Sequence, residues 1–311
     1  ETMLANFLNK SKPINFIGIL VFFLICYLVT VITAFFNTDF SADKLLKSLV
    51  LLLLFLSLFF FFNFILNKNK LTFDNLYAYF IFTLFVICIL PELGTYKTLI
   101  LVTIYLFVLR KLYSLRSSKK VIQKLFDSGF WLGTLFLLEP ISILFFILIF
   151  TGISLHQKIT LHTLFTPVIG FIAPLFIYFT YSFWFDKTEE FTNLFNFNVN
   201  FDIELYTKTK FIWFFACVFI ASFLSIIFKS VETIGVSNTF RRSWSLLITN
   251  FFIVLLFLAL LPAKNGSEVL FILFPASVII TNGIQLIKKK IVKNLILYGF
   301  LLGSIYFCFF L

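Results

Sequence analysis

Acidic side chains that follow apolar runs are the residues of this sequence best placed to do chemistry. Two of them follow the first run, one stands between two later runs, and the others follow a longer run together with a lysine. Carboxylates at such positions can act as a general base, or can hold a divalent cation against a phosphate. If their loops converge, they form an outward-facing cavity; otherwise they are solvated charges of separate loops. The candidate site residues are Asp39, Asp43, Glu139, Asp186, Lys187 and Glu190.

Glu139 stands directly before Pro140, with apolar sequence on both sides. A carboxylate near the hydrocarbon core of a membrane costs about 2.5–3.5 kcal/mol unless it is paired. Pro140 has no N–H and disfavours helix in the residue before it, so residues 119–158 are predicted to form a hairpin of two short helices with Glu139 at its tip. Gly129 and Gly133, four residues apart, predict a face that a second helix can approach closely. In the alternative interpretation, Glu139 is an ordinary carboxylate at the level of the lipid headgroups.

The elements that must position these residues are membrane helices, because 61% of the 311 residues are hydrophobic and the mean hydropathy is +1.05. A soluble domain of this size does not have such a composition. We predict an all-α fold, a single integral-membrane domain over residues 1–311 with about eleven spans, ten to twelve being compatible with the pattern. No soluble domain is expected, and the longest outer loop is residues 186–210. The apolar runs lie roughly at 15–36, 45–66, 75–91, 97–114, 121–137, 140–155, 163–185, 211–228, 244–262, 269–287 and 295–311.

The charged residues predict how these spans are oriented. With the N-terminus in the cytoplasm, most of the 25 Lys and Arg residues fall on that side, and most of the 14 Asp and Glu residues fall on the other. Cytoplasmic loops are the basic ones, so we predict a cytoplasmic N-terminus and a periplasmic C-terminus. The net charge of +11 then serves topology and contact with membrane lipid, and no nucleic acid is expected as a partner. The pair Arg241-Arg242 is interpreted as an anchor facing anionic lipid, with a direct grip on lipid phosphates as the alternative.

Metal and cofactor sites of the common kinds are not predicted. The four cysteines all stand inside apolar runs and none forms a CxxC pair, while the only histidines are His156 and His162. These residues are too few and too scattered for a zinc site of the usual kind. Nucleotide-binding motifs with their phosphate-cradling glycines are also lacking. The metal requirement therefore stays open, with a divalent cation held by the acidic residues as the remaining candidate.

Two resemblances bear on function. The opening MLANFLNKSKPINFIGILVFF and the block GFWLGTLFLLEPISILFFILIF resemble an uncharacterised polytopic inner-membrane family of Bacteroidota. The layout is similar to that of GT-C glycosyltransferases, which move sugars from polyprenyl-phosphate carriers. The second resemblance implies a catalytic role for Asp39, as base or metal contact directly after the first span, with Glu139 as a second catalytic carboxylate. It also implies substrate contacts from Asp43, Asp186, Lys187 and Glu190.

Three functions follow as hypotheses for a multi-pass protein of the bacterial inner (cytoplasmic) membrane. The first is a GT-C-like glycosyltransferase that uses a polyprenyl-phosphate-linked sugar on the periplasmic side, where Asp39 and Glu139 would line one cavity. The second is a non-catalytic inner-membrane subunit of an envelope assembly, export or secretion complex, with other membrane subunits as partners. The third is a transporter. The sugar, its acceptor and the identity of any protein partner stay open.

Overall fold

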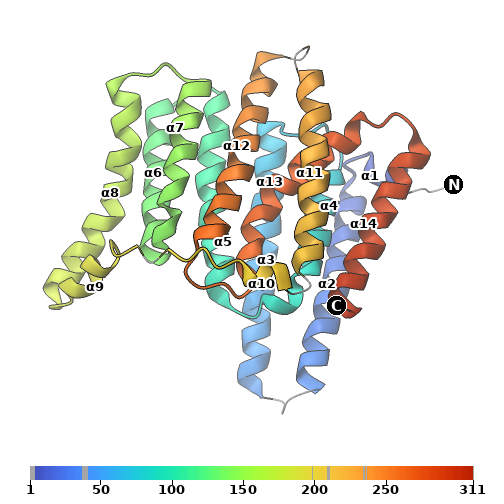
Figure 1. The fold of residues 1–311 in the computed structure, drawn as a ribbon, viewed down its shortest axis with the longest axis horizontal. Helices are drawn as coiled ribbons and strands as arrows, with labels where there is room; N and C mark the ends of the chain where they lie inside the picture. Colours follow the sequence, from blue (N-terminus) through green and yellow to red (C-terminus); the bar gives the residue numbers. More distant parts are fainter. Residues whose placement is uncertain are drawn as a thin grey trace. The chain divides into compact units, whose positions relative to one another are not determined.

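The computed structural model describes residues 4–36, 41–197, 199–208, 211–233, 235 and 237–310, and every regular element in these ranges is a helix (Figure 1). Nine helices among the described residues are long and apolar enough to cross a membrane. Two further apolar helical segments, Tyr77–Cys88 and Pro140–His156, are shorter. The predicted all-α, polytopic membrane fold is confirmed, whereas the span count of eleven and the orientation stay predictions.

The helices group into two compact units, each made of segments that are far apart in the sequence. Unit 1 comprises Glu1–Leu99, Glu204–Gly235 and Asn265–Leu311, and unit 2 comprises Ile100–Ile203 and Val236–Lys264. The helices of unit 1 are α1 (Leu4–Leu8), α2 (Pro13–Phe36), α3 (Ala42–Asn69), α4 (Tyr77–Cys88), η1 (Leu90–Glu92), α10 (Glu204–Lys208), α11 (Phe211–Thr233), η4 (Ser267–Val269), α13 (Leu270–Leu286) and α14 (Lys290–Phe310).

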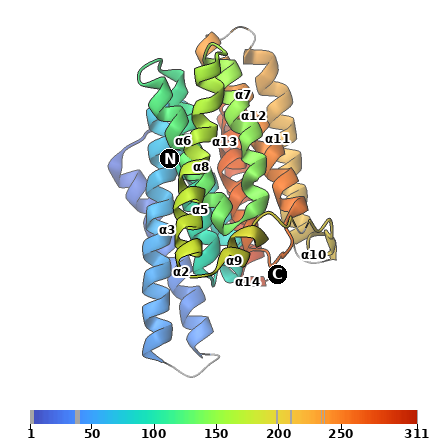
Figure 2. The same cartoon turned by 90° about the vertical axis from the view of Figure 1, so that its left-hand side faces the viewer.

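Unit 1 is built around α4, in which every side chain from Tyr77 to Cys88 is buried. Helices α2, α3, α13 and α14 contact α4, and α11 packs on α13. Aromatic rings fill much of this core; the rings of Phe62 and Phe82, for example, stack with centroids 4.0 Å apart. Helices α2 and α3 run side by side in both views (Figures 1 and 2). The short, wholly buried α4 is therefore the centre around which the longer helices of unit 1 gather.

Unit 2 begins within α5 (Tyr96–Tyr113) and contains the predicted hairpin. Helix α6 ends at Leu138, Glu139 adopts an extended backbone, and Pro140 begins the short 3-10 helix η3, as the proline chemistry predicts. The turn at Glu139 is thus confirmed. The other helices of this unit are η2 (Ser114–Arg116), α6 (Val121–Leu138), η3 (Pro140–Leu144), α7 (Phe145–His156), α8 (Leu161–Trp184), α9 (Thr188–Asn193) and α12 (Asn238–Leu260).

Glycines bring α6 and α8 into close backbone contact. A Cβ on Gly129 would meet the backbone of Pro167, and a Cβ on Gly133 would meet the carbonyl of Phe171. Gly170 of α8 makes the same kind of contact in the opposite direction, because a Cβ there would meet the backbone of Phe126 in α6. Gly129 meets Pro167, and Gly133, four residues later in α6, meets Phe171, four residues later in α8. The two helices are therefore parallel. The close-packing face predicted at Gly129 and Gly133 is confirmed.

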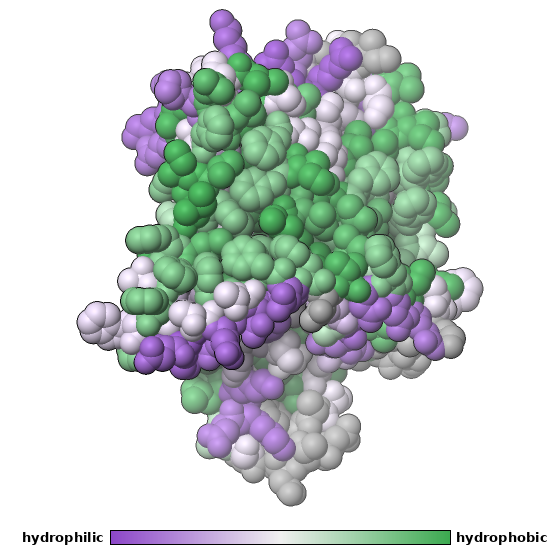
Figure 3. All heavy atoms as spheres, turned by 60° about the vertical axis from the view of Figure 1, so that its left-hand side comes forward, coloured by the Kyte–Doolittle hydropathy of each residue, from purple (hydrophilic) through white to green (hydrophobic). Residues whose placement is uncertain are grey.

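Side chains on the outside of the molecule follow the pattern of a membrane protein. In the space-filling view of Figure 3, apolar side chains cover the middle of the displayed face, and hydrophilic side chains gather toward both of its ends. Many large apolar side chains of the apolar helices are exposed, among them Phe176 of α8 and Leu295 of α14. Such a surface is stable against lipid tails rather than water, so the protein is a multi-pass membrane protein.

Candidate functional site

The predicted catalytic pair is described only in part, because Asp39 lies outside the described residues. Glu139, the other member, is half-buried at the tip of the α6–η3 turn. Its N–H donates to the carbonyl of Leu135 at 2.8 Å, and its own carbonyl accepts from the N–H of Ser142 at 3.0 Å. The backbone on both sides of the carboxylate is therefore fixed by hydrogen bonds.

Asp186 and Lys187 lie in the turn from α8 to α9, Glu190 lies in the first turn of α9, and all three are exposed. Asp186 has a left-handed backbone with φ 54°, which lets the chain turn sharply after α8. The Lys187 Nζ and Glu190 Oε1 atoms are 3.4 Å apart, in an exposed ion pair of the kind that contributes little to stability. Because α6 and α8 are parallel, Glu139 and this turn follow the carboxyl ends of neighbouring helices, at one end of unit 2.

Phenylalanines fold the segment after α8 back over the carboxyl end of α6. The Phe191 ring of α9 packs on Phe179 of α8, with centroids 5.1 Å apart. Further along, the Phe195 ring lies 5.8 Å from that of Phe136 in α6. The Lys264 ammonium holds the rest of this segment by donating to the carbonyls of Asn200 and Asp202. Glu139 therefore lies at an end of unit 2 that aromatic contacts keep in place.

Asp43 belongs to unit 1 and is exposed in the first turn of α3. The hydroxyl of Ser41, the N-cap of that helix, accepts from the N–H of Lys44 at 3.3 Å. An acidic residue beside a helix N-terminus interacts favourably with the helix dipole, so the position also has a purely structural explanation. The convergence of Asp39 and Asp43 with Glu139 stays a prediction. In the described ranges no three His, Cys, Asp or Glu side chains gather as a metal site would require.

Sequence reasoning missed a buried carboxylate in unit 1. Glu268, only 6% exposed, accepts from the Tyr206 hydroxyl at 2.5 Å and from the N–H groups of Gly266 at 3.1 Å and Asn265 at 3.2 Å. Burial, and then the charge of Glu268, raise the pKa of Tyr206, so the phenol keeps the proton that it donates. With three donors the carboxylate is satisfied, and it fastens α10 to the start of α13. In the sequence, the only sign that Glu268 is buried is the apolar pair Val269 and Leu270 directly after it.

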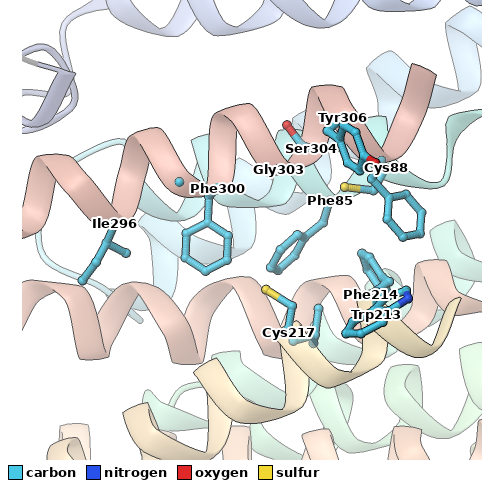
Figure 4. A pocket seen from close by; sticks show the side chains of 13 residues that line it. Phe85, Cys88, Trp213, Phe214, Cys217, Ile296, Phe300, Gly303, Ser304 and Tyr306 are labelled. Carbon is cyan, nitrogen blue, oxygen red and sulfur yellow. The ribbon is translucent and has the colours of Figure 1, made fainter. Parts of the chain in front are cut away.

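Unit 1 also contains an apolar cavity of about 590 Å³ between α4, α11 and α14. Phe85 of α4, Phe214 of α11 and Phe300 of α14 project into the space between the helices (Figure 4). Trp213 lies at the same end as Phe214 and is 70% exposed. The cavity is therefore a groove with aromatic walls, and we call it the α11–α14 groove.

Two glycines of α14, Gly299 and Gly303, line the α11–α14 groove. Among the described residues, nothing lies within 4 Å of a Cβ added at either position. Their spacing of four places them on one face of the helix, as for Gly129 and Gly133 in α6. Sequence reasoning singled out the first pair and passed over the second, although both stand in apolar runs at the same spacing.

The profile of a family of unknown function, DUF6427, matches residues 3–311, so the chain belongs to that family. No curated protein and no solved structure matches the chain. The family membership agrees with the expected resemblance to a family without an assigned activity. The bacterial group and the GT-C resemblance stay predictions.

Proposed function

We propose that this member of the DUF6427 family is a subunit of a membrane-protein complex, and that it binds one transmembrane helix of a partner protein in the α11–α14 groove. The observation that carries the proposal is the open face at Gly299 and Gly303, where the described part of the chain leaves nothing within 4 Å of an added Cβ. Of the functions considered, a subunit of an envelope assembly, export or secretion complex in the bacterial inner membrane agrees best with such a surface.

The open glycines favour a helix over lipid as the occupant of the groove. Glycine in a helix interior costs about 0.5–1 kcal/mol relative to alanine, and among the described residues of unit 1 no close contact offsets that cost at Gly299 or Gly303. Lipid tails adapt to any apolar surface and do not require a row of missing side chains. A partner helix does, because membrane helices associate through van der Waals contact and small residues let their backbones approach. The aromatic side chains of the walls would then pack along both flanks of the partner.

The test uses two exposed tryptophans as a matched pair. Trp213 lines the groove, and Trp184, which is 79% exposed at the end of α8, does not. A photo-crosslinking amino acid at position 213 should yield one protein adduct of fixed mass in native membranes, and the same group at position 184 should not. Substituting both Gly299→Leu and Gly303→Leu should remove the adduct while the protein level is unchanged. Crosslinks from position 213 to lipid alone would contradict the proposal.

A catalytic function is the second candidate, favoured by one specific observation. Glu139 is half-buried at the end of a closely packed helix pair, with Lys187 and Glu190 following the neighbouring helix at the same end of unit 2. A GT-C-like glycosyltransferase would use such a carboxylate beside a phosphate-linked sugar, with Asp39 as base or metal contact.

The catalytic proposal is tested in proteoliposomes that contain a polyprenyl-phosphate-linked sugar, with water or an added alcohol as the acceptor that takes the sugar. Release of the polyprenyl phosphate should fall by at least about 100-fold for Asp39→Asn and for Glu139→Gln, the loss typical of a missing general base, with unchanged thermal unfolding. Glu189→Gln, on the exposed face of α9, is the control and should retain full activity. If the wild-type protein releases no carrier, with or without Mg²⁺, the catalytic proposal is contradicted and only the subunit proposal remains.

A further inference from the structure

A second cavity lies in unit 2, at the end of the unit that is predicted to be cytoplasmic. Its volume is about 360 Å³, within the range of pockets that hold small ligands. Helix α7 contributes Leu155, and the first two turns of α12 contribute Asn238, Arg241, Arg242 and Ser245. Two guanidinium groups therefore line one small cavity.

Several of the other charged side chains at this end already have partners. Lys111 and Asp127 form an ion pair with their atoms 2.6 Å apart. Lys124 donates to the carbonyls of Ser114 and Ser117. Asp127 is the only acidic residue that unit 2 has at this end, because the remaining ones, Glu139, Asp186, Glu189, Glu190 and Asp202, follow the carboxyl ends of α6 and α8. In the described part of the chain no ion pair neutralises Arg241 or Arg242.

The beginning of α12 adds further groups that favour an anion. Its N-cap residue, Ser237, makes no side-chain hydrogen bond to the helix. The first N–H groups of a helix carry partial positive charge, so an acidic residue is the favourable choice there. This 23-residue helix has no acidic residue in its first turn and places two arginines beside it instead. The N–H of Phe240 already donates to the carbonyl of Ser237, so a bound anion would accept from the N–H groups of Asn238 and Thr239 and from both arginines.

His156 is an independent sign that a hydrogen-bonding group is missing. It follows Leu155, which lines the cavity, and its Nε2 atom is buried without a hydrogen-bond partner in the described part of the chain. The positive charges of Arg242 and Arg116 both act on this ring. Buried polar atoms in native proteins nearly always have a partner, so the unpaired Nε2 indicates that a hydrogen-bonding group is missing at this end of α7, next to the residue that lines the cavity.

We propose that the cavity between α7 and α12 binds a phosphate group, held by Arg241 and Arg242 and by the first N–H groups of α12. The flat fork of a guanidinium matches the oxygens of a phosphate, and two of them can bind one group from two directions. The phosphate can come from the headgroup of an anionic phospholipid or from a soluble phosphate compound. The site lies in unit 2 and does not depend on the helix-binding groove of unit 1.

The test measures the thermal unfolding midpoint of the purified full-length protein in detergent. One series adds inorganic phosphate, a second adds phosphatidylglycerol, and phosphatidylcholine and chloride serve as references. Arg241→Gln/Arg242→Gln removes the two charges, and Asn238→Leu obstructs the cavity without changing charge. Lys288→Gln/Lys289→Gln is the matched control, because it removes two exposed charges from a loop outside the cavity.

Wild type and the lysine control should show the same rise in midpoint, and both cavity variants should require at least about tenfold more ligand for it. A rise with phosphatidylglycerol alone assigns the phosphate to a lipid headgroup, and a rise with inorganic phosphate assigns it to a soluble ligand. The proposal is overturned if neither addition raises the wild-type midpoint, or if the lysine control loses the rise as well. It is also overturned if Asn238→Leu behaves as wild type, because the anion would then sit on surface charge and not in the cavity.

Discussion

Helices α6 and α14 each carry two glycines at a spacing of four, and the two pairs have opposite surroundings. At Gly129 and Gly133 the backbone of α8 occupies the place of the missing side chains. At Gly299 and Gly303 that place is open. The comparison teaches that the spacing marks a face for close approach but does not say whether the approaching helix belongs to the same chain. In unit 2 the partner is internal, and in unit 1 we infer that it is another protein.

The largest effect is expected for Gly129→Ala. The new Cβ would meet the carbonyl oxygen, carbonyl carbon and Cα of Pro167, and a helix backbone cannot move aside as a flexible side chain can. We expect α6 and α8 to be forced apart, at a cost of about 3 kcal/mol in the free energy of unfolding. Unfolding in mixed detergent micelles measures it. A variant as stable as wild type would show that α6 and α8 are farther apart than described.

Gly133→Ala should have a smaller effect of the same kind, about 2 kcal/mol. One of its near neighbours is a side-chain atom, the Cγ of Pro174 at 2.6 Å, although the Phe171 carbonyl is also close. Gly152→Ala in α7 is the control within the same unit. Its Cβ would lie 3.5 Å from a Leu112 side-chain carbon, an ordinary contact, so its stability should stay within about 0.5 kcal/mol of wild type. Equal losses of stability for Gly133→Ala and Gly152→Ala would contradict a special role for the α6–α8 contact.

Tyr206→Phe tests unit 1, the other unit in the comparison. The substitution should loosen the contact of α10 with the beginning of α11, a helix that lines the α11–α14 groove. The Tyr206 hydroxyl donates to the buried Glu268 carboxylate, and its ring packs on Phe215 of α11 with centroids 5.0 Å apart. Loss of the donor should cost about 1.5 kcal/mol in the free energy of unfolding, since a buried carboxylate loses one of its three hydrogen bonds. Hydrogen exchange should increase at Asn265 and Gly266, whose N–H groups bond the same carboxylate.

For Tyr206 the informative control is Tyr298→Phe, which changes an exposed tyrosine of α14 outside the groove lining and should leave stability unchanged. If Tyr206→Phe were equally neutral, the Glu268 cluster would not hold α10 to the start of α13. The shape of the α11–α14 groove would then depend only on the packing of its aromatic rings.

Much of the fold was predictable because membrane helices are specified locally. Continuous apolar runs fixed where helices lie, and Pro140 fixed the turn after α6 through its missing N–H. The division into two units was not predictable in the same way. It depends on which helix faces meet across long stretches of sequence, as when α11 packs on α13. Such pairings are set by side-chain shape, and hydropathy carries no information about it.

The candidate site was less accessible to sequence reasoning. Glu139 and the Asp186–Glu190 turn were correctly expected beside helix ends, since charged residues interrupt apolar runs there. Glu268 was overlooked because the only sequence sign of its burial is the apolar pair Val269 and Leu270 that follows it, and a solvated loop charge before an apolar run has the same neighbours. The groove was overlooked because an empty space leaves no mark in the sequence except small residues. Only the contacts around Gly299 separate an open face from a filled one.

The smallest effect on stability is expected where the comparison is most informative, at Gly299→Ala and Gly303→Ala. No described residue lies within 4 Å of either new Cβ, and alanine is the better helix former, so the free energy of unfolding of the isolated protein should change by less than about 1 kcal/mol for each variant. The crosslink from position 213 should nevertheless weaken, because a partner backbone could no longer approach α14 as closely. A loss of about 2 kcal/mol or more in the isolated protein would mean that its own chain fills the groove. Unchanged stability with an unchanged crosslink would mean that the partner, if one binds, does not rest on this face of α14.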